Sequence, residues 1–141
     1  WYSTYPPDWT PELDAFPGDT LAEKGLARTY DNLRKAYEMG ITITIGSDSF
    51  SFVTPYGFVS IDEMYDFVDR VGIPILDAIK AATSNGAKML GKEDEFGSLK
   101  AGKSADLLVV KGDVVRDIHA LTPDAMEVIM KGGDIVIKGA L

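Results

Sequence analysis

A short run of alternating β-branched residues, Ile41-Thr42-Ile43-Thr44-Ile45, most constrains how this chain folds. β-branched side chains favour extended backbone, and the strict alternation of apolar Ile with polar Thr is typical of a strand that has one apolar and one polar face. Helical patterns precede and follow the run. The order helix, strand, helix is typical of an α/β unit, in which helices cover a parallel strand. The sequence therefore predicts an α/β first part built around one strand at 41–45.

Two predicted helices beside that strand each begin at a capping box. Thr20 and Glu23 have the spacing at which two side chains satisfy free N–H groups at a helix start, and Ser60 and Glu63 repeat it. Apolar residues follow the first box at helical spacing until Gly40, which is a typical helix terminator. We assign Glu63 a capping role and no catalytic one.

The pattern changes near Gly91. Residues 76–90 predict one or two further short helices, whereas glycines beyond Gly91 separate short β-rich runs. These runs are 107–110, 126–130 and 135–137. Lys131-Gly132-Gly133-Asp134 predicts a tight hairpin between the last two, because glycine tolerates positive φ at both turn positions. We expect two parts, 1–91 and 92–141.

Length and composition exclude several classes of protein. A complete eight-fold α/β barrel needs about 250 residues, and the chain has 141. Zero Cys and one His exclude disulfides, thiolate metal sites and a self-contained His-rich centre. A net charge of −8 argues against nucleic-acid or anionic-membrane partners, and no apolar run is long enough to cross a bilayer.

The chain begins at Trp1 with neither a starting Met nor a signal-like segment. We therefore expect it to be a piece of a longer protein. The absence of Cys is compatible with a cytoplasmic location.

Asp48 is the first candidate for chemistry, in the motif Gly46-Ser47-Asp48-Ser49 that ends the predicted strand. In parallel α/β folds, loops at the C-terminal ends of strands build the active site. A carboxylate there can ligate a divalent cation and accept a proton from water. The alternative is that Asp48 hydrogen-bonds its own loop, as Asp commonly does in turns.

Aromatic residues follow Asp48 in the next loop. Phe50 and Tyr56 are candidate substrate contacts, and Phe50 belongs with Phe52 and Phe58 to a set that either walls a pocket or packs in a core. The one histidine, His119, lies in the β-rich tail. A lone histidine there is predicted to be a surface or capping residue rather than a ligand.

Four segments, taken in order, resemble the C-terminal part of the amidohydrolase superfamily. Gly46-Ser47-Asp48-Ser49 looks like the motif after its eighth barrel strand, and 78–91 is similar to the stretch that follows. Residues 97–107 resemble the segment entering its small β-sandwich, and 128–133 resemble its terminal hairpin. The resemblance covers about residues 22–141, nearest to the imidazolonepropionase-like and Xaa-Pro dipeptidase-like branch.

The resemblance implies both a fold and an activity. The implied fold class is α/β: residues 1–91 as the C-terminal fragment of a (β/α)8 TIM-type barrel, then 92–141 as strands of a small β-sandwich. Such enzymes use one or two divalent metals, here expected to be zinc, to hydrolyse C–N bonds of amides, peptides or cyclic amides. The resemblance implies that Asp48 is a metal ligand and that it accepts the proton of the attacking water.

The chain also departs from the family pattern. The family's His-x-His pair, its Lys or Glu from a middle strand and its two further His have no counterpart here. Pro55-Tyr56-Gly57 stands where dipeptidase-like members often carry Pro-His-Gly. We therefore expect that the isolated chain binds no catalytic metal and is inactive. The small amide or dipeptide-like substrate would bind the intact enzyme, with the remainder of the barrel as this chain's partner.

A non-catalytic module is the alternative hypothesis. A lone barrel strand leaves backbone N–H and C=O groups without ladder partners, and these groups must be satisfied elsewhere. An α/β module that binds a partner, or associates with its own copies, would satisfy them.

Overall fold

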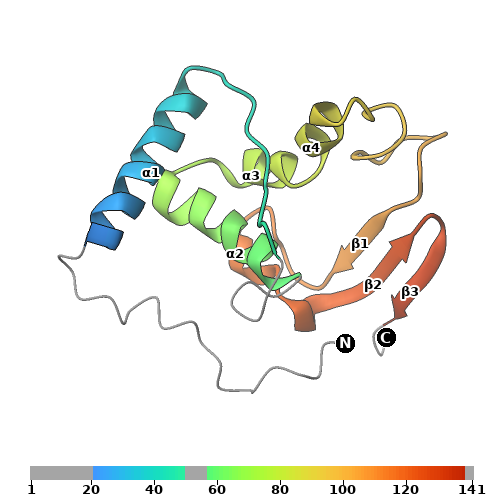
Figure 1. Cartoon of the computed structure of the whole chain (residues 1–141). Helices are drawn as coiled ribbons and strands as arrows, with labels where there is room; N and C mark the ends of the chain where they lie inside the picture. Colours follow the sequence, from blue (N-terminus) through green and yellow to red (C-terminus); the bar gives the residue numbers. More distant parts are fainter. Residues whose placement is uncertain (1–20, 50–56, 139–141) are drawn as a thin grey trace.

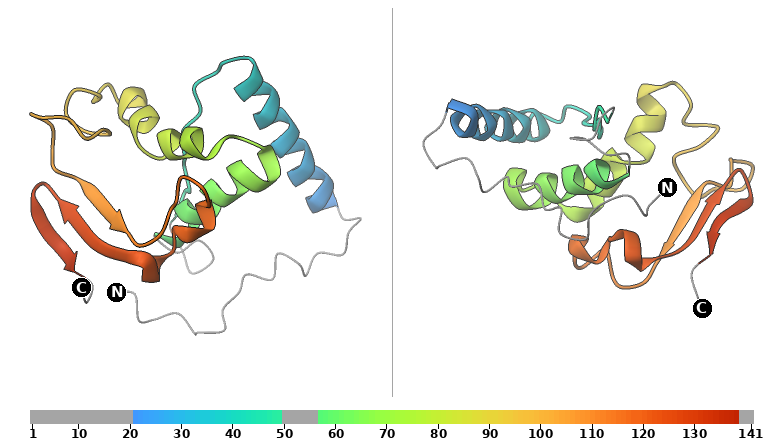
Figure 2. Two further views of the ribbon diagram at one scale, coloured as in Figure 1. Left: turned by 180° about the vertical axis from the view of Figure 1, so that it is seen from behind. Right: turned by 60° about the horizontal axis from the view of Figure 1, so that its bottom comes forward.

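The computed structural model describes residues 21–49 and 57–138. Its helices are α1 (Leu21–Glu38), α2 (Phe58–Asp66), α3 (Ile75–Ala81) and α4 (Ser84–Met89). Its strands are β1 (Leu107–Val110), β2 (Met126–Lys131) and β3 (Asp134–Lys138). A π-helical turn, η3 (Phe67–Val71), extends α2, and two 3-10 turns, η4 (Ile118–Ala120) and η5 (Pro123–Ala125), precede β2. The helices gather at one end and the sheet at the other (Figures 1 and 2).

Helix α1 ends as its sequence predicts. Gly40 takes a φ of 76°, and its N–H donates to the Tyr37 carbonyl at 2.9 Å. The next N–H, of Ile41, donates to the Ala36 carbonyl at 3.0 Å. This is the Schellman arrangement, which satisfies carbonyls at the end of a helix. The chain leaves α1 at a defined angle and enters the extended segment 41–45, which the 46–49 turn follows.

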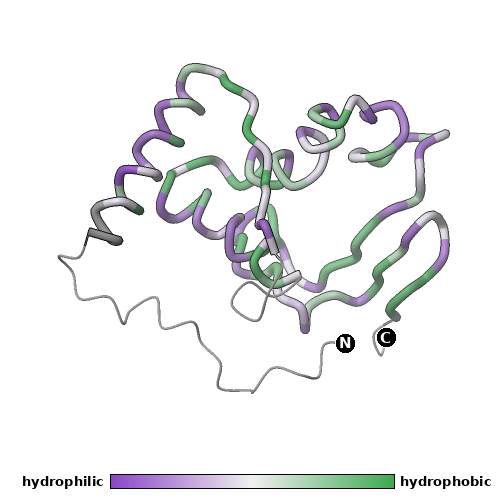
Figure 3. The backbone as a smooth tube through the Cα atoms, viewed as in Figure 1, coloured by the Kyte–Doolittle hydropathy of each residue, from purple (hydrophilic) through white to green (hydrophobic). Residues whose placement is uncertain are grey.

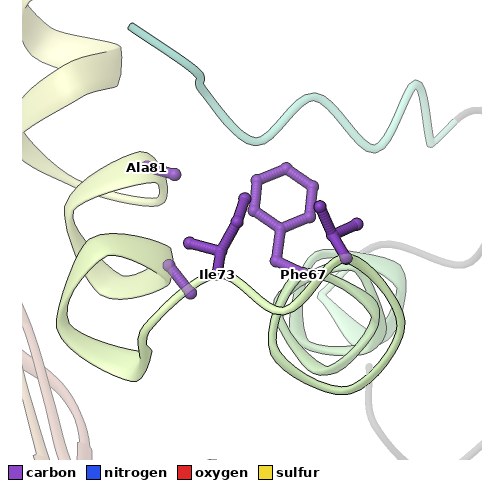
Figure 4. Packing of buried hydrophobic residues seen from close by; sticks show 5 residues of the cluster. Phe67, Ile73 and Ala81 are labelled. Carbon is purple, nitrogen blue, oxygen red and sulfur yellow. The ribbon is translucent and has the colours of Figure 1, made fainter. Parts of the chain in front are cut away.

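The helices enclose a buried cluster of Phe67, Val71, Ile73, Ala78 and Ala81. Side chains of α1 and of the extended segment pack against it: Tyr30, Leu33, Tyr37, Ile43 and Ile45. Figure 4 shows Phe67 and Ile73 directed toward the teal extended segment. Ile43 and Ile45 therefore face the cluster together, because residues two apart in an extended chain share one face.

A second buried cluster joins the two ends of the molecule. Ile61 and Met64 of α2 pack with Ile118 and Leu121, which lie between β1 and β2. The Tyr65 hydroxyl also donates to the Leu121 carbonyl at 2.5 Å. No buried polar or charged residue occurs among the described residues. The sheet is therefore connected to α2 mainly by apolar contact.

The strand predicted at 41–45 is absent from the described structure. The segment is extended but has no neighbouring strand, so no ladder defines it as a strand. Three strands form in the described residues, and all lie in the C-terminal sheet. Periodicity predicts the local backbone shape, whereas a strand also requires a pairing partner.

The capping box predicted at Ser60 is also wrong. Helix α2 begins at Phe58 with Gly57 as N-cap, which makes no side-chain cap hydrogen bond, so Ser60 and Glu63 lie inside the helix. Their side chains contact the 46–49 turn instead. The first capping box includes Thr20, which lies outside the described residues, although α1 does begin at Leu21.

The C-terminal sheet has the order β1-β2-β3, with both pairs antiparallel. The predicted hairpin is confirmed, with Gly132 at φ 59° and Gly133 at φ 94°. Asp106 accepts hydrogen bonds from the Gly132 N–H at 2.6 Å and from Lys131 Nζ at 2.9 Å. These contacts hold the start of β1 against the hairpin turn.

Apolar side chains remain exposed on this sheet. Figure 3 shows hydrophobic residues along its strands, and Leu108, Val109, Ile135 and Val136 are each more than 40% exposed. The described residues form one three-stranded sheet rather than the two facing sheets of a sandwich. No described helix has the length and apolar character needed to cross a membrane.

Candidate functional site

The candidate site is the turn Gly46-Ser47-Asp48-Ser49 at the end of the extended segment. Two hydrogen bonds hold the segment before it. Asn85 Nδ2 of α4 donates to the Ile43 carbonyl at 2.8 Å, and the Ile45 N–H donates to the Ala81 carbonyl of α3 at 3.1 Å. Helices α3 and α4 thus fix the backbone up to the residue at which the turn begins.

Asp48 has an uncommon backbone conformation. Its φ is 46°, and no other non-glycine residue in the described ranges has positive φ. The left-handed region is disfavoured by about 1–2 kcal/mol for most residues, although Asp and Asn enter it more readily. The Asp48 side chain is exposed. The turn therefore presents this carboxylate outward from the end of the segment.

Two residues of α2 contact the turn. Both carboxylate oxygens of Glu63 accept the Gly46 N–H, at 3.2 Å and 3.1 Å. The Ser60 hydroxyl donates over 3.4 Å to Ser47 Oγ. Ser49 also donates to Ser47 Oγ, at 2.9 Å. Helix α2 is therefore attached to the turn at two successive residues.

Two acids of α2, Asp62 and Glu63, lie in an environment that disfavours their charge. Burial raises the pKa of Glu63, the Gly46 N–H opposes that effect, and the charge of Asp66 adds to it. Burial also raises the pKa of Asp62, with a smaller contribution from Asp66. Glu63 is therefore half-buried with a backbone N–H that stabilises its ionised form.

The remaining predicted residues lie elsewhere or outside the description. The candidate substrate contacts Phe50 and Tyr56 lie outside the described residues. His119 Nε2 lies 3.0 Å from Asp69 Oδ2, and its ring centroid is 4.5 Å from that of Tyr65. These contacts place His119 at the surface beside α2, and none of them reaches the turn.

The family resemblance implies that Asp48 is one ligand of a divalent metal in the intact enzyme. In the described ranges, no group of three or more His, Cys, Asp or Glu side chains has the geometry to hold a metal ion. Asp48 offers one carboxylate of the right chemistry, and a catalytic zinc site takes three protein ligands. These residues therefore do not make up a metal site by themselves.

A cavity of about 220 Å³ lies near the opposite end of the extended segment. One of the polar residues that line it is Asp77, which accepts hydrogen bonds from the Tyr37 hydroxyl at 2.6 Å and from Lys80 Nζ at 2.7 Å. Those partners, Lys80 first, lower the pKa of Asp77, and the bond to Asp77 raises that of Tyr37. Asp48 does not line this cavity.

The contact from Glu63 to the turn was missed at the level of sequence. The available signal was the three-residue spacing of Ser60 and Glu63, which places both on one helix face. The same spacing defines a capping box. The spacing therefore predicted correctly that Ser60 and Glu63 share a helix face. It predicted wrongly that they cap the helix.

Known proteins resemble this chain over most of its length. The model of the amidohydrolase family matches residues 18–136. An ochratoxinase from Aspergillus niger is 32% identical over 127 residues, covering 84% of this chain and 25% of that protein. An imidazolonepropionase from Porphyromonas gingivalis is 30% identical over 117 residues, covering 79% of this chain and 26% of that protein.

A solved structure shares the fold of the described part. It is an Xaa-Pro dipeptidase with methionine bound in its active site, 38% identical, with a TM-score of 0.67. The match covers 78% of this chain and 25% of that one. The chain thus spans about a quarter of the length of the relatives it matches. The resemblance predicted from its motifs is confirmed, and the chain belongs to the amidohydrolase family.

Proposed function

We propose that this chain is the C-terminal portion of a metal-dependent amidohydrolase. The intact enzyme hydrolyses C–N bonds in small amides, dipeptide-like compounds or cyclic amides, using an activated water. One observation carries the proposal: the chain's family match includes the Gly46–Ser49 motif, and Asp48 of that motif is exposed at the end of an extended segment. Loops in this position build active sites in α/β barrels.

In this proposal Asp48 has two roles. Its carboxylate is one ligand of a divalent cation, zinc, and it accepts a proton from the attacking water. A cation bound there lowers the pKa of water toward about 7. Phe50 and Tyr56 contact the substrate. The other ligands come from the rest of the enzyme, so the isolated chain is inactive.

The exposed surface of segment 41–45 supports the proposed place of this chain in the barrel. Residues 1–91 end a (β/α)8 barrel, and 92–141 supply strands of a small β-sandwich. The extended segment 41–45 has no strand beside it in the described structure. Met39, which precedes the segment, and Ile41, at its start, are 77% and 53% exposed. Large apolar side chains exposed together mark surfaces that another part of a protein covers.

The same uncovered surface also supports a second candidate. A non-catalytic α/β module would bind a partner, or a second copy, along segment 41–45. The two functions differ in what covers the segment: a barrel strand of the same enzyme, or another molecule. Light scattering on the intact protein distinguishes them when combined with an activity assay, because an inactive oligomer supports only the module.

The experiment uses the intact protein that contains this chain, loaded with zinc. Hydrolysis is assayed on N-acyl amino acids, Xaa-Pro dipeptides and cyclic amides. We expect Asp48→Asn, which keeps the size of the side chain and removes its charge, to lower kcat/KM by about 10²–10⁴-fold. The matched control is Asp94→Asn, an exposed acid in the loop after α4.

Wild-type turnover by Asp48→Asn would overturn the role given to Asp48. Stoichiometric zinc and Asp48-dependent turnover in the isolated 141 residues would overturn the proposal that the remaining ligands lie elsewhere.

A further inference from the structure

Helix α2 holds the turn that carries Asp48 at two points. Ser60 and Glu63 are three residues apart, so their side chains lie on one face of the helix. The Glu63 carboxylate accepts the Gly46 N–H with both oxygens, and Ser60 reaches Ser47 Oγ. One rigid element therefore contacts the two residues that precede Asp48.

The chain before Asp48 is therefore held at three successive residues, by backbone bonds at the first two and by a side-chain bond at the third. The Ile45 N–H is bonded to α3, the Gly46 N–H to Glu63, and the Ser47 hydroxyl to Ser49 and Ser60. Asp48 then takes its positive φ of 46°. A residue in a sparsely populated conformation stays there only where its surroundings over-determine it. The contacts from α2 are surroundings of this kind.

No ion pair among the described residues explains the burial of Glu63. Within the described ranges, its carboxylate forms no salt bridge, and the Gly46 N–H is the partner that the structure gives it. Partial burial disfavours a carboxylate that has no ion pair. A contribution to surface stability therefore does not explain why Glu63 lies where it does. A charge-assisted hydrogen bond to backbone N–H is about twice as strong as a neutral one.

We propose that Glu63 is a positioning residue for Asp48. By holding Gly46, it sets the start of the turn and the direction in which the Asp48 carboxylate leaves the backbone. This inference rests on the proposed function of Asp48 as a metal ligand. Groups that orient metal ligands typically change metal affinity or activity by about 10–100-fold when they are removed.

The test uses Glu63→Ala and Glu63→Gln in the intact, zinc-loaded protein. Alanine removes both acceptor oxygens, whereas glutamine keeps one neutral oxygen that can accept the Gly46 N–H. We expect about 10–100-fold losses in kcat and in zinc affinity for Glu63→Ala, an intermediate loss for Glu63→Gln, and KM near its wild-type value. The matched control is Asp62→Ala, because Asp62 is an acid of the same helix whose pKa is also raised by burial, and it has no hydrogen bond to the turn.

A lower Tm with unchanged kcat and zinc affinity would show that Glu63 acts only on stability, and it would overturn the inference. If Glu63→Ala does not fold, Glu63→Gln decides between these outcomes.

A crystal structure of the intact Glu63→Ala protein separates failure of this inference from failure of the proposed function. We expect Asp48 to leave its positive φ and its carboxylate to turn away. An Asp48 that keeps its wild-type conformation overturns the positioning role, whatever the activity. The other outcome is that Asp48 moves in the Glu63→Ala structure but the wild-type enzyme neither binds zinc nor hydrolyses any substrate. That outcome overturns the proposed function, and with it the effect of the positioning on catalysis.

Discussion

The side-chain amide of Asn85 donates a hydrogen bond to the backbone carbonyl of Ile43 at 2.8 Å, across 42 positions of sequence. Two residues further along the chain, the Ile45 N–H donates to the Ala81 carbonyl at 3.1 Å. In an extended chain, residues two apart direct their backbone groups to the same edge. Helices α3 and α4 therefore bond to one edge of this segment where a sheet would supply a strand.

Asn85→Ala removes the donor and leaves the Ile43 carbonyl, which is half-buried, without it. We expect the free energy of unfolding to fall by about 1–3 kcal/mol, the range for an unsatisfied buried acceptor. Urea denaturation measures the change. Asn32→Ala is the matched control, because Asn32 is exposed on α1. Equal effects of the two substitutions would contradict the role of the Asn85 bond.

Gly97 packs too closely on α4 to carry a side chain. A Cβ added there would lie 2.5 Å from the Ala87 Cβ and 3.1 Å from the Thr83 carbonyl oxygen, and the φ of Gly97 is 85°. Ala87 is only 1% exposed, so it has no room to move. We expect Gly97→Ala to lower the free energy of unfolding by about 2–5 kcal/mol, combining left-handed strain with overpacking.

The control for that prediction is Gly102→Ala. Gly102 has nearly the same φ, 89°, but no atom lies within 4 Å of a Cβ added there. Its substitution therefore reports the backbone strain alone, about 1–2 kcal/mol. Thermal or urea unfolding of both variants separates the two effects. Similar losses at Gly97 and Gly102 would show that the contact with Ala87 is unimportant.

Tyr30 connects α1 to α2 by a bond that depends on its proton. Its hydroxyl donates to Asp66 Oδ2 at 2.6 Å. Burial, followed by this hydrogen bond, raises the pKa of Tyr30 from 10.0 to about 12. The folded protein therefore holds the phenol proton more tightly than the unfolded chain does. The stabilisation is complete below pH 10 and is lost as pH rises toward 12.

We expect Tyr30→Phe to lower the free energy of unfolding by about 1 kcal/mol at neutral pH, the usual net value of one hydrogen bond. The variant should also lack the decline in stability that ionisation of Tyr30 causes between pH 10 and 12. Unfolding measured across that range, with phenolate absorbance followed in parallel, checks both effects. An unchanged alkaline profile in Tyr30→Phe would contradict the assignment.

Features of local origin were predictable. The end of α1 at Gly40 and the Lys131–Asp134 hairpin depend on the backbone freedom of glycine, which a few neighbouring residues reveal. The short helices at 76–90 and the three β-rich runs follow from periodicity in the same way. The family resemblance was also within reach, because four motifs occur in order along one chain.

Other features depended on partners that periodicity does not specify. Ile43 and Ile45 alternate as in a strand, yet no strand pairs with them in the described structure. Ser60 and Glu63 have capping spacing, but α2 starts earlier, at Phe58, and leaves their side chains free for the turn. In each case the local pattern admits two outcomes, and contacts with distant residues choose between them.

Sequence alone determined which segments are helical, where the hairpin turns and which family the chain resembles. These properties arise from interactions between near neighbours and from motifs that can be read in order. The tertiary structure alone decided that Glu63, 17 positions after Gly46, holds the turn before Asp48. The reason is that a hydrogen bond depends on distance and direction in space, and helix packing sets both for residues far apart in the chain.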